Sequence, residues 1–174
     1  MHTIAKTMNE LDIHIAQQQD LSRIVEIYNS TIASRLVTAD TEPVTPASRQ
    51  KWFDEHTAHK RPLWVVKDDT QTIVAWISFQ SFYGRPAYDG TAEVSIYIAP
   101  EQRGKGLGQQ LLQFAIEKAP EFAIKTLLGF IFSHNIPSIK LFEKFGFQEW
   151  GHFPNIAELD KVERSLSIFG KRVG

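Results

Sequence analysis

The turn at residues 102–108 constrains the fold of this chain more than any other segment. It reads Gln-Arg-Gly-Lys-Gly-Leu-Gly and lies between an alternating segment at 91–98 and a helical pattern at about 106–118. Glycines at alternate positions let the backbone turn with several N–H groups converging on one side. At a helix N-terminus these donors favour an anion by about 0.3–1 kcal/mol. Arg103 and Lys105 add positive charge, so the turn predicts a site for a phosphate or pyrophosphate.

Two common phosphate motifs do not fit this turn. Gly104, Gly106 and Gly108 give Gly-x-Gly-x-Gly. A P-loop needs four residues between its glycines followed by Lys and Ser or Thr, and the dinucleotide fingerprint needs Gly-x-Gly-x-x-Gly. On the glycines alone, an ordinary strand-to-helix connection with solvated charges remains an alternative.

The segment 91–98 has one polar and one apolar face. Alternation assigns Thr91, Glu93, Ser95 and Tyr97 to the first face, and Ala92, Val94, Ile96 and Ile98 to the second. Because this strand leads directly into the glycine turn, its polar face predicts a wet cleft near the bound anion. The alternative is an antiparallel strand with one solvated face.

The rest of the chain predicts alternating helices and strands around this unit. We expect strands at 11–15, 63–67, 72–80, 126–132, 147–153 and 162–169. A helix capped by Asp20 is expected to carry Leu21, Ile24, Val25, Tyr28 and Ile32 on one face. A second helix is expected to start at Thr45-Pro46, and a third to run over 137–145. We expect one domain over 1–174, with about the first ten residues flexible.

Composition excludes several classes of protein. A net charge of -1 argues against a nucleic-acid binder, and the lack of cysteine excludes disulfides and thiolate chemistry. Residues 1–9 lack a signal-peptide core, and no apolar run approaches a membrane span, so we expect no membrane partner and a cytoplasmic location. The six histidines lack ligand spacing, and we expect no metal.

Two ordered motifs resemble the GNAT acetyltransferase superfamily. Residues 103–108 match its Arg/Gln-x-x-Gly-x-Gly/Ala motif, and Asn135, Ser138 and the segment 141–147 are similar to its N-x-x-S and L-Y-E-K-x-G-F blocks. The resemblance implies a mixed α/β fold, with a mostly antiparallel sheet of about seven strands and helices on both faces. It also implies acetyl-CoA as acetyl donor. A narrower likeness, at 27–29, 41–43, 52–53, 85–88 and 93–98, is to phosphinothricin and methionine sulfoximine acetyltransferases, which acetylate a small amino acid.

The resemblance assigns roles to individual residues. The implied cofactor-binding residues are Ile96, Tyr97, Ile98, Arg103, Gly104, Lys105, Gly106, Leu107, Gly108, Gln109, Asn135 and Ser138. The implied substrate-binding residues are Tyr83, Gly84, Arg85, Glu93, Val94 and Ser95. Backbone groups of 96–98 would pair with the pantetheine amides like an added strand. Arg85 would hold a substrate carboxylate, although a solvated loop arginine is the alternative.

Chemistry gives Glu93 a reason to act as the general base. Only a neutral amine attacks a thioester, and a lysine-like amine is neutral in about one molecule in 2,500 at pH 7. That shortage corresponds to roughly 4–5 kcal/mol of barrier, which a nearby base can reduce. In many members of the family a tyrosine can protonate the leaving thiolate, but this chain has Phe142 at that position. Either Tyr97 or water would then supply the proton, or CoA would leave as the thiolate.

The sequence leaves other functions open. The same chemistry could serve a protein N-terminus or a polyamine, and a non-catalytic acyl-CoA sensor would keep the turn without needing Glu93. Near-neutral charge and the nearby Arg85 argue against a polycation. By analogy with relatives we expect a homodimer.

Overall fold

The computed structural model describes residues 11–174, so the expected flexibility of the first ten residues lies outside the described part of the chain. The strands are β1 (Asp12–Ile15), β2 (Leu63–Lys67), β3 (Ile73–Ser81), β4 (Thr91–Ile98), β5 (Thr126–Phe132), β6 (Gln148–Leu159) and β7 (Val162–Arg172). The helices are α1 (Leu21–Asn29), α2 (Pro46–Asp54), α3 (Leu107–Lys118) and α4 (Ile136–Lys144).

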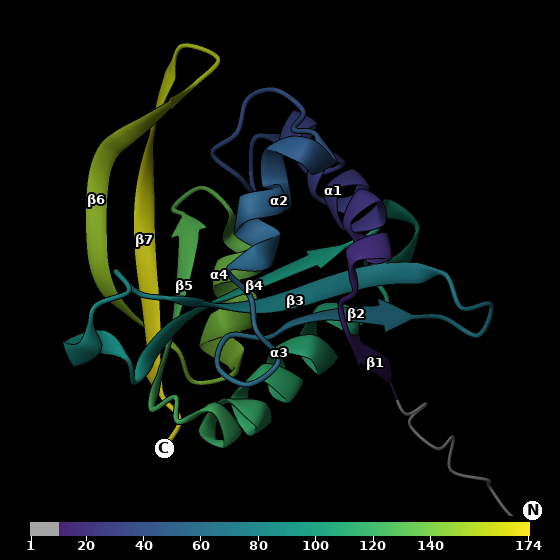
Figure 1. Ribbon diagram of the computed structural model, residues 1–174. Coiled ribbons are helices and arrows are strands. Elements are labelled where there is room, and N and C mark those ends of the chain that lie inside the picture. Colours follow the sequence, from purple (N-terminus) through teal and green to yellow (C-terminus); the bar gives the residue numbers. More distant parts are fainter. Residues whose placement is uncertain (1–10) are drawn as a thin grey trace, which may run out of the picture.

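The seven strands form one sheet in the order β1-β2-β3-β4-β5-β7-β6. Neighbouring strands are antiparallel except β4 and β5, which are parallel. Figure 1 shows α1 and α2 on one face of the sheet and α3 and α4 on the other. The mixed, mostly antiparallel sheet with helices on both faces confirms the fold expected from the sequence.

Each face of the sheet has its own apolar cluster. On the α3 side, Phe79 and Val94 pack with Leu111 and Phe142. On the α1 side, Val65 and Trp76 pack with Ile24 and Ile27, and Trp52, Phe53 and Tyr97 lie against them. Because neighbouring side chains on a strand point to opposite faces, the alternation seen at 91–98 sends Val94 to the first cluster and Glu93 to the opposite face.

The start of α1 differs from the expectation. The Asp20 carboxylate accepts a hydrogen bond from the Gln17 N–H at 2.8 Å, and it makes no capping bond to α1. It closes a short 3-10 turn at Gln18–Asp20 that leads into the helix. At the other end, α1 stops at Asn29, so the expected position of Ile32 within this helix is wrong. Ile32 is buried in a separate 3-10 turn.

The expected start of α2 is confirmed. The Thr45 hydroxyl oxygen accepts a hydrogen bond from the Ser48 N–H at 3.1 Å, and Pro46 occupies the first helical turn. Proline is favoured there because its missing N–H would have no helical partner. None of the helices within residues 11–174 is long and apolar enough to span a membrane.

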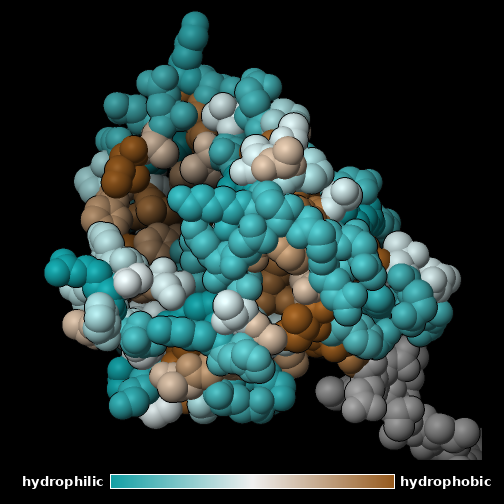
Figure 2. Space-filling view, in the orientation of Figure 1, coloured by the Kyte–Doolittle hydropathy of each residue, from teal (hydrophilic) through white to brown (hydrophobic). Residues whose placement is uncertain are grey.

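The last two strands are longer than expected and form a hairpin. Asp160 and Lys161 connect them with φ of 51° and 64°. A two-residue turn with both φ values positive matches the twist of paired strands. Such a turn usually contains Asn-Gly or Asp-Gly, so the pair Asp160-Lys161 does not indicate it in the sequence. Figure 1 shows the hairpin extending beyond the other strands. Figure 2 shows hydrophobic side chains among hydrophilic ones on this side of the molecule.

Candidate active site

The central feature of the site is the point where β4 and β5 part. Their pairing covers only Thr91–Glu93 and Thr126–Leu128, although β4 continues to Ile98 and β5 to Phe132. Beyond Glu93, the peptide groups of β4 that face β5 therefore have no partner in that strand. A free strand edge of this kind can bind an extended ligand through its backbone.

A cleft of about 600 Å³ lies at this point, and we call it the interstrand cleft. It is bounded by β4, β5, the glycine turn, the start of α4 and the loop at 34–37. Ten of the predicted cofactor-binding residues line it: Ile96, Tyr97, Ile98, Arg103, Gly104, Gly106, Gly108, Gln109, Asn135 and Ser138. Lys105 and Leu107 are not among its lining residues. The binding roles of all twelve residues remain predictions.

The three glycines of the turn differ in backbone conformation and surroundings. Gly104 and Gly106 have φ of 73° and 81°, a left-handed conformation that favours glycine, and a Cβ on either would meet nothing within 4 Å. Gly108 lies in α3, where a Cβ would be 3.5 Å from Leu141 Cδ2. Gly106 is also the N-cap of α3 and offers no side chain to cap it. The start of α3 is therefore left free for an anion.

Arg103 is tied to the protein around the turn. Its Nε donates to the Ile98 carbonyl at 3.1 Å, and its Nη2 donates to the Ser30 hydroxyl at 3.1 Å. The side chain thus joins the turn to the end of β4 and to the end of α1. Lys105 is exposed. Arg103 therefore fixes the position of the turn, and part of its hydrogen-bonding capacity is already used.

Asn135 also has a structural part in the cleft. Its Oδ1 accepts from the Ser138 N–H at 3.3 Å and caps α4, while its Nδ2 donates to the Leu36 carbonyl at 3.1 Å. The same loop is also held by the β6–β7 hairpin, because the Arg35 guanidinium donates to both carboxylate oxygens of Asp160 at 2.8 and 3.1 Å. The β6–β7 hairpin and α4 together fix the wall of the interstrand cleft.

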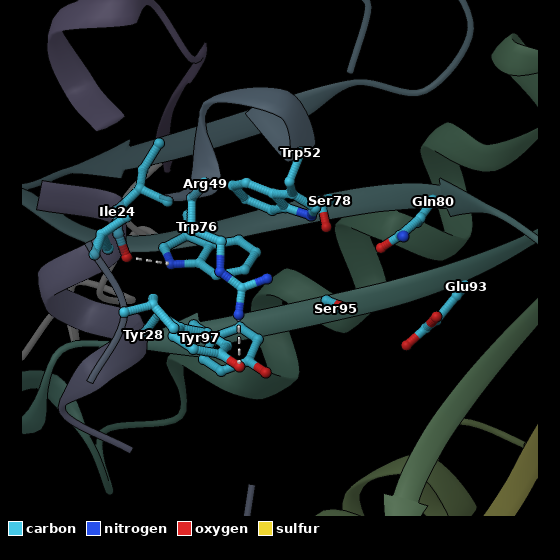
Figure 3. Close-up of a pocket in the computed structure, with 12 residues that line it drawn as sticks. Ile24, Tyr28, Arg49, Trp52, Trp76, Ser78, Gln80, Glu93, Ser95 and Tyr97 are labelled. Atoms are coloured by element: carbon cyan, nitrogen blue, oxygen red, sulfur yellow. Dashed lines mark hydrogen bonds between the residues drawn. The ribbon is translucent and has the colours of Figure 1, made fainter. Parts of the chain in front are cut away.

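A second cavity lies between the sheet and the helices α1 and α2, and we call it the aromatic pocket. Its volume is about 220 Å³, and its floor is made of three cross-strand pairs: Trp76 with Tyr97, Ser78 with Ser95, and Gln80 with Glu93 (Figure 3). Ile24, Val25, Tyr28, Val44, Arg49 and Trp52 complete the lining. Glu93, Ser95 and Tyr97 line both cavities. This polar face of β4 is therefore the boundary between them.

Glu93 is the acidic group at that boundary. Burial raises the pKa of its carboxyl group from 4.5 to about 7. No salt bridge or side-chain hydrogen bond within residues 11–174 involves this carboxyl group. A carboxylate whose pKa lies close to neutral pH can both accept and return a proton there, which is the property a general base needs.

The other end of the aromatic pocket combines Tyr97, which the sequence analysis assigned to cofactor binding, with Arg49 and Asp40, which it did not mark as functional. Trp76 stacks on Tyr97 with ring centroids 4.4 Å apart and donates its Nε1–H to the Ile24 carbonyl at 3.1 Å. The Arg49 guanidinium lies 5.0 Å from the centre of the Tyr28 ring and forms an ion pair with Asp40. Arg49 and Asp40 do not belong to any recognisable sequence motif. Their proximity arises only when α2 packs beside α1.

Three of the predicted substrate-binding residues lie outside both cavities. Tyr83 is 78% exposed, Arg85 is exposed, and neither lines the interstrand cleft or the aromatic pocket. Gly84 lines a separate cavity with His56 and Arg61. Of the predicted substrate-binding set, the cavities bring together Glu93, Val94 and Ser95. A role for the 83–85 loop remains a prediction.

Phe142 lies on the wall of the interstrand cleft where the family often has tyrosine. Its ring packs on Gly129 so closely that a Cβ there would come within 2.4 Å of Phe142 Cε1. Tyr97 supplies a phenol on the shared boundary, and burial raises the pKa of its hydroxyl group. That hydroxyl therefore keeps its proton at neutral pH.

Comparison with known proteins identifies the family of this chain. The family described as Acetyltransferase (GNAT) family matches residues 21–147. A Bacillus subtilis (strain 168) protein, YwnH, whose name as a phosphinothricin acetyltransferase is provisional, is 56% identical over 94% of this chain and 99% of its own length. An L-methionine sulfoximine/L-methionine sulfone acetyltransferase of Pseudomonas aeruginosa is 34% identical over 80% of this chain and 81% of its own.

A solved structure is similar in fold. The phosphinothricin acetyltransferase of Sinorhizobium meliloti, in complex with AcCoA, superimposes with a TM-score of 0.87 over 94% of this chain and 89% of its own, at 24% identity. The chain belongs to the GNAT acetyltransferase family. It is an acetyltransferase related to the phosphinothricin and methionine sulfoximine acetyltransferases.

Proposed function

We propose that this protein transfers the acetyl group of acetyl-CoA to the α-amine of a small amino acid or analogue. Methionine sulfoximine, methionine sulfone and phosphinothricin are the substrates expected from its relatives. The observation that carries the proposal is the position of Glu93. It lies where β4 and β5 part and borders both the interstrand cleft and the aromatic pocket.

The interstrand cleft has the features that a CoA thioester requires. The glycine turn and the uncapped start of α3 provide backbone donors for the diphosphate. The free edge of β4 at 96–98 provides backbone partners for the pantetheine amides. A backbone N–H on this edge would also polarise the thioester carbonyl, as an oxyanion-hole donor does.

The aromatic pocket supplies the amine from the other side. Glu93 accepts the proton of the substrate ammonium group, and the nitrogen lone pair then attacks the thioester carbonyl carbon. The new C–N bond forms as the C–S bond breaks, and the acetyl group passes directly to the amine without an acyl-enzyme. The nitrogen loses its second proton to water or to the departing sulfur. The sulfur leaves as thiolate or takes a proton, for which Tyr97 or water is available since Phe142 has no hydroxyl group.

A thiol-release assay tests this proposal. Purified protein is mixed with acetyl-CoA and each member of a panel: methionine sulfoximine, methionine sulfone, phosphinothricin, spermidine and a peptide with a free N-terminus. We expect free thiol only with the amino acids, and mass spectrometry should show the product heavier by one acetyl group. Turnover of the peptide or spermidine alone would assign a different acceptor. Tight acetyl-CoA binding without turnover of any amine would make the proposal wrong.

We also propose that the protein forms a homodimer through the β6–β7 hairpin. Strand β6 is an edge of the sheet, and the hairpin exposes four large apolar side chains: Trp150, Phe153, Ile156 and Val162. Exposed apolar edges of this kind are commonly covered by a second copy. Light scattering should give twice the chain mass of 19.8 kDa. Ile156→Asp should lower that mass, and a monomeric wild type would refute the dimer.

A further inference from the structure

The aromatic pocket has one cation and one carboxyl group, and they lie at opposite ends. Among the described residues that line it, Arg49 is the only arginine or lysine and Glu93 is the only acidic residue. Figure 3 shows the Arg49 side chain beside the Tyr28 and Tyr97 rings, with Glu93 beyond Ser95 at the other end. A substrate that touches both groups must lie along the pocket floor.

The length of the floor limits what can touch both ends. Glu93 and Tyr97 are four residues apart on β4, which corresponds to about 13 Å along the strand. The Ser78–Ser95 pair separates the acidic end from the aromatic end. The α-carboxylate carbon of an amino acid lies only about 2.5 Å from its own nitrogen. With its amine beside Glu93, the carboxylate therefore stays at the Glu93 end.

A longer side chain places acceptor atoms further along the floor, away from Glu93. An oxygen five bonds from the nitrogen lies about 6 Å from it when the chain is extended. Two bonded oxygens on a phosphorus or sulfur at the end of a two-carbon side chain lie at this distance, displaced from Glu93 toward the Arg49 end. The small side chains of Ser78 and Ser95 line the floor between its two ends, where the two side-chain carbons of the substrate would lie.

Arg49 is held in position and retains free donors. Its Nη2 donates to the Tyr28 hydroxyl at 3.3 Å and to the Asp40 carboxylate, and its guanidinium packs on the Tyr28 ring. Tyr28 also bonds Asp40, which closes the network. Within residues 11–174 no hydrogen bond uses Nε or Nη1 of Arg49. An arginine has five N–H donors in a rigid fork, so the remaining ones can bind paired oxygens.

We propose that Arg49 determines the substrate specificity of this pocket by binding a phosphinate or sulfonyl oxygen about five bonds from the nucleophilic nitrogen. This inference rests on the proposed function and names the residue that selects its substrate class. Asp40 is a positioning residue, because it holds the guanidinium without lining the pocket, whereas Tyr28 both holds the guanidinium and lines the pocket. The Arg49–Asp40 pair has no net charge, so an uncharged sulfone is accepted as well as a phosphinate.

Methionine sulfone and methionine make a matched pair of probes, because they differ only by two oxygens on sulfur. For the wild type, we expect kcat/KM to be about 10- to 100-fold higher with methionine sulfone than with methionine. Arg49→Gln should remove this preference, lowering the sulfone value about tenfold or more beyond any change in the methionine value. Arg49→Lys should recover only part of it, because lysine lacks the planar fork.

Lys51→Gln is the matched control, since it removes one positive charge from an exposed position of the same helix. It should keep the preference for the sulfone. An equal loss with both substrates in Arg49→Gln, or an unchanged preference, would overturn the inference. Unchanged thermal unfolding and acetyl-CoA affinity would show that the variant is folded.

A binding measurement separates this inference from the proposed function. Calorimetric titration of the CoA-saturated protein with each probe needs no turnover. The wild type should bind methionine sulfone about tenfold or more tightly than methionine, and Arg49→Gln should bind them equally. If this holds but no amine releases thiol, the proposed function fails and the Arg49 site stands. If thiol is released but the wild type binds the probes equally, the Arg49 site fails alone.

Discussion

At the scale of single residues, the position of Glu93 on β4 distinguishes it from the other acidic residues. Alternation places it on the polar face of β4, and the parting of β4 and β5 places it between two cavities. Burial raises its pKa to about 7, with no charged partner needed. A general base needs a pKa close to the working pH, and here the fold produces that value through desolvation.

The first prediction concerns catalysis by Glu93. In the wild type, kcat/KM should rise with pH through an apparent pKa near 7, since the carboxyl group must be ionised to accept a proton. Glu93→Gln should lower kcat/KM at pH 7 by about 10²-fold or more and remove that limb. Part of the activity should return at high pH, where the amine loses its proton unaided. A variant with the wild-type pH profile would exclude Glu93 as the base.

The second prediction concerns stability. The folded pKa of about 7 lies above the unfolded value of 4.5, so the folded protein holds this proton more tightly. The associated stability is fully present below pH 4.5 and is lost as the pH rises through 7. The loss is at most about 3 kcal/mol. Between pH 5 and pH 8, Glu93→Gln should therefore gain free energy of unfolding relative to wild type, as measured by urea denaturation. A pH-independent difference would contradict the raised pKa.

At the scale of elements, the glycine turn and the loop at 34–37 define the interstrand cleft. Gly104 and Gly106 supply left-handed backbone, and Arg103 ties the turn to α1 and β4. The loop is held by Asn135 and by the Arg35–Asp160 pair. Arg103 and Asn135, which the sequence analysis assigned to ligand binding, therefore use part of their hydrogen-bonding capacity to position the backbone.

The third prediction belongs to this turn. Gly106→Ala should cost about 1 kcal/mol or more of stability, because alanine is strained at a φ of 81°. Acetyl-CoA affinity, measured by calorimetry, should fall with it. Gly108→Ala is the matched stability control: its φ is not left-handed, its Cβ would make ordinary contacts, and alanine favours a helix. Equal stability losses in both variants would show that backbone conformation is not the cause.

At the scale of the whole molecule, the sheet is built as two parts that separate at β4 and β5. The first part carries α1 and α2 and the aromatic pocket, and the second carries β7 and β6, whose hairpin reaches the loop over the cleft. Figure 1 shows β4 and β5 joined at one end and parting toward the other. The interstrand cleft is therefore the gap in the sheet itself.

The fourth prediction follows from that gap. Adding acetyl-CoA should slow hydrogen exchange at those amides of 94–98 that face β5, because a ligand strand would replace the missing partner. Amides of Thr91–Glu93 are already within the paired region and should change little. Mass spectrometry of short peptides from β4 can resolve the two regions. Equal protection before and after acetyl-CoA is added would argue against backbone pairing at this edge.

The sequence by itself determined the elements whose causes are local. Alternation at 91–98, proline at the start of α2 and glycines at the turn each follow from the geometry of a few neighbouring residues, and the motif resemblance extended them to the fold and family. The tertiary structure alone decided the aromatic pocket, because Arg49, Asp40 and Tyr28 meet only when α1 and α2 pack together. It also decided the pKa of Glu93, since desolvation depends on everything that surrounds a group, and the structural use of Arg103 and Asn135, whose partners are distant in sequence.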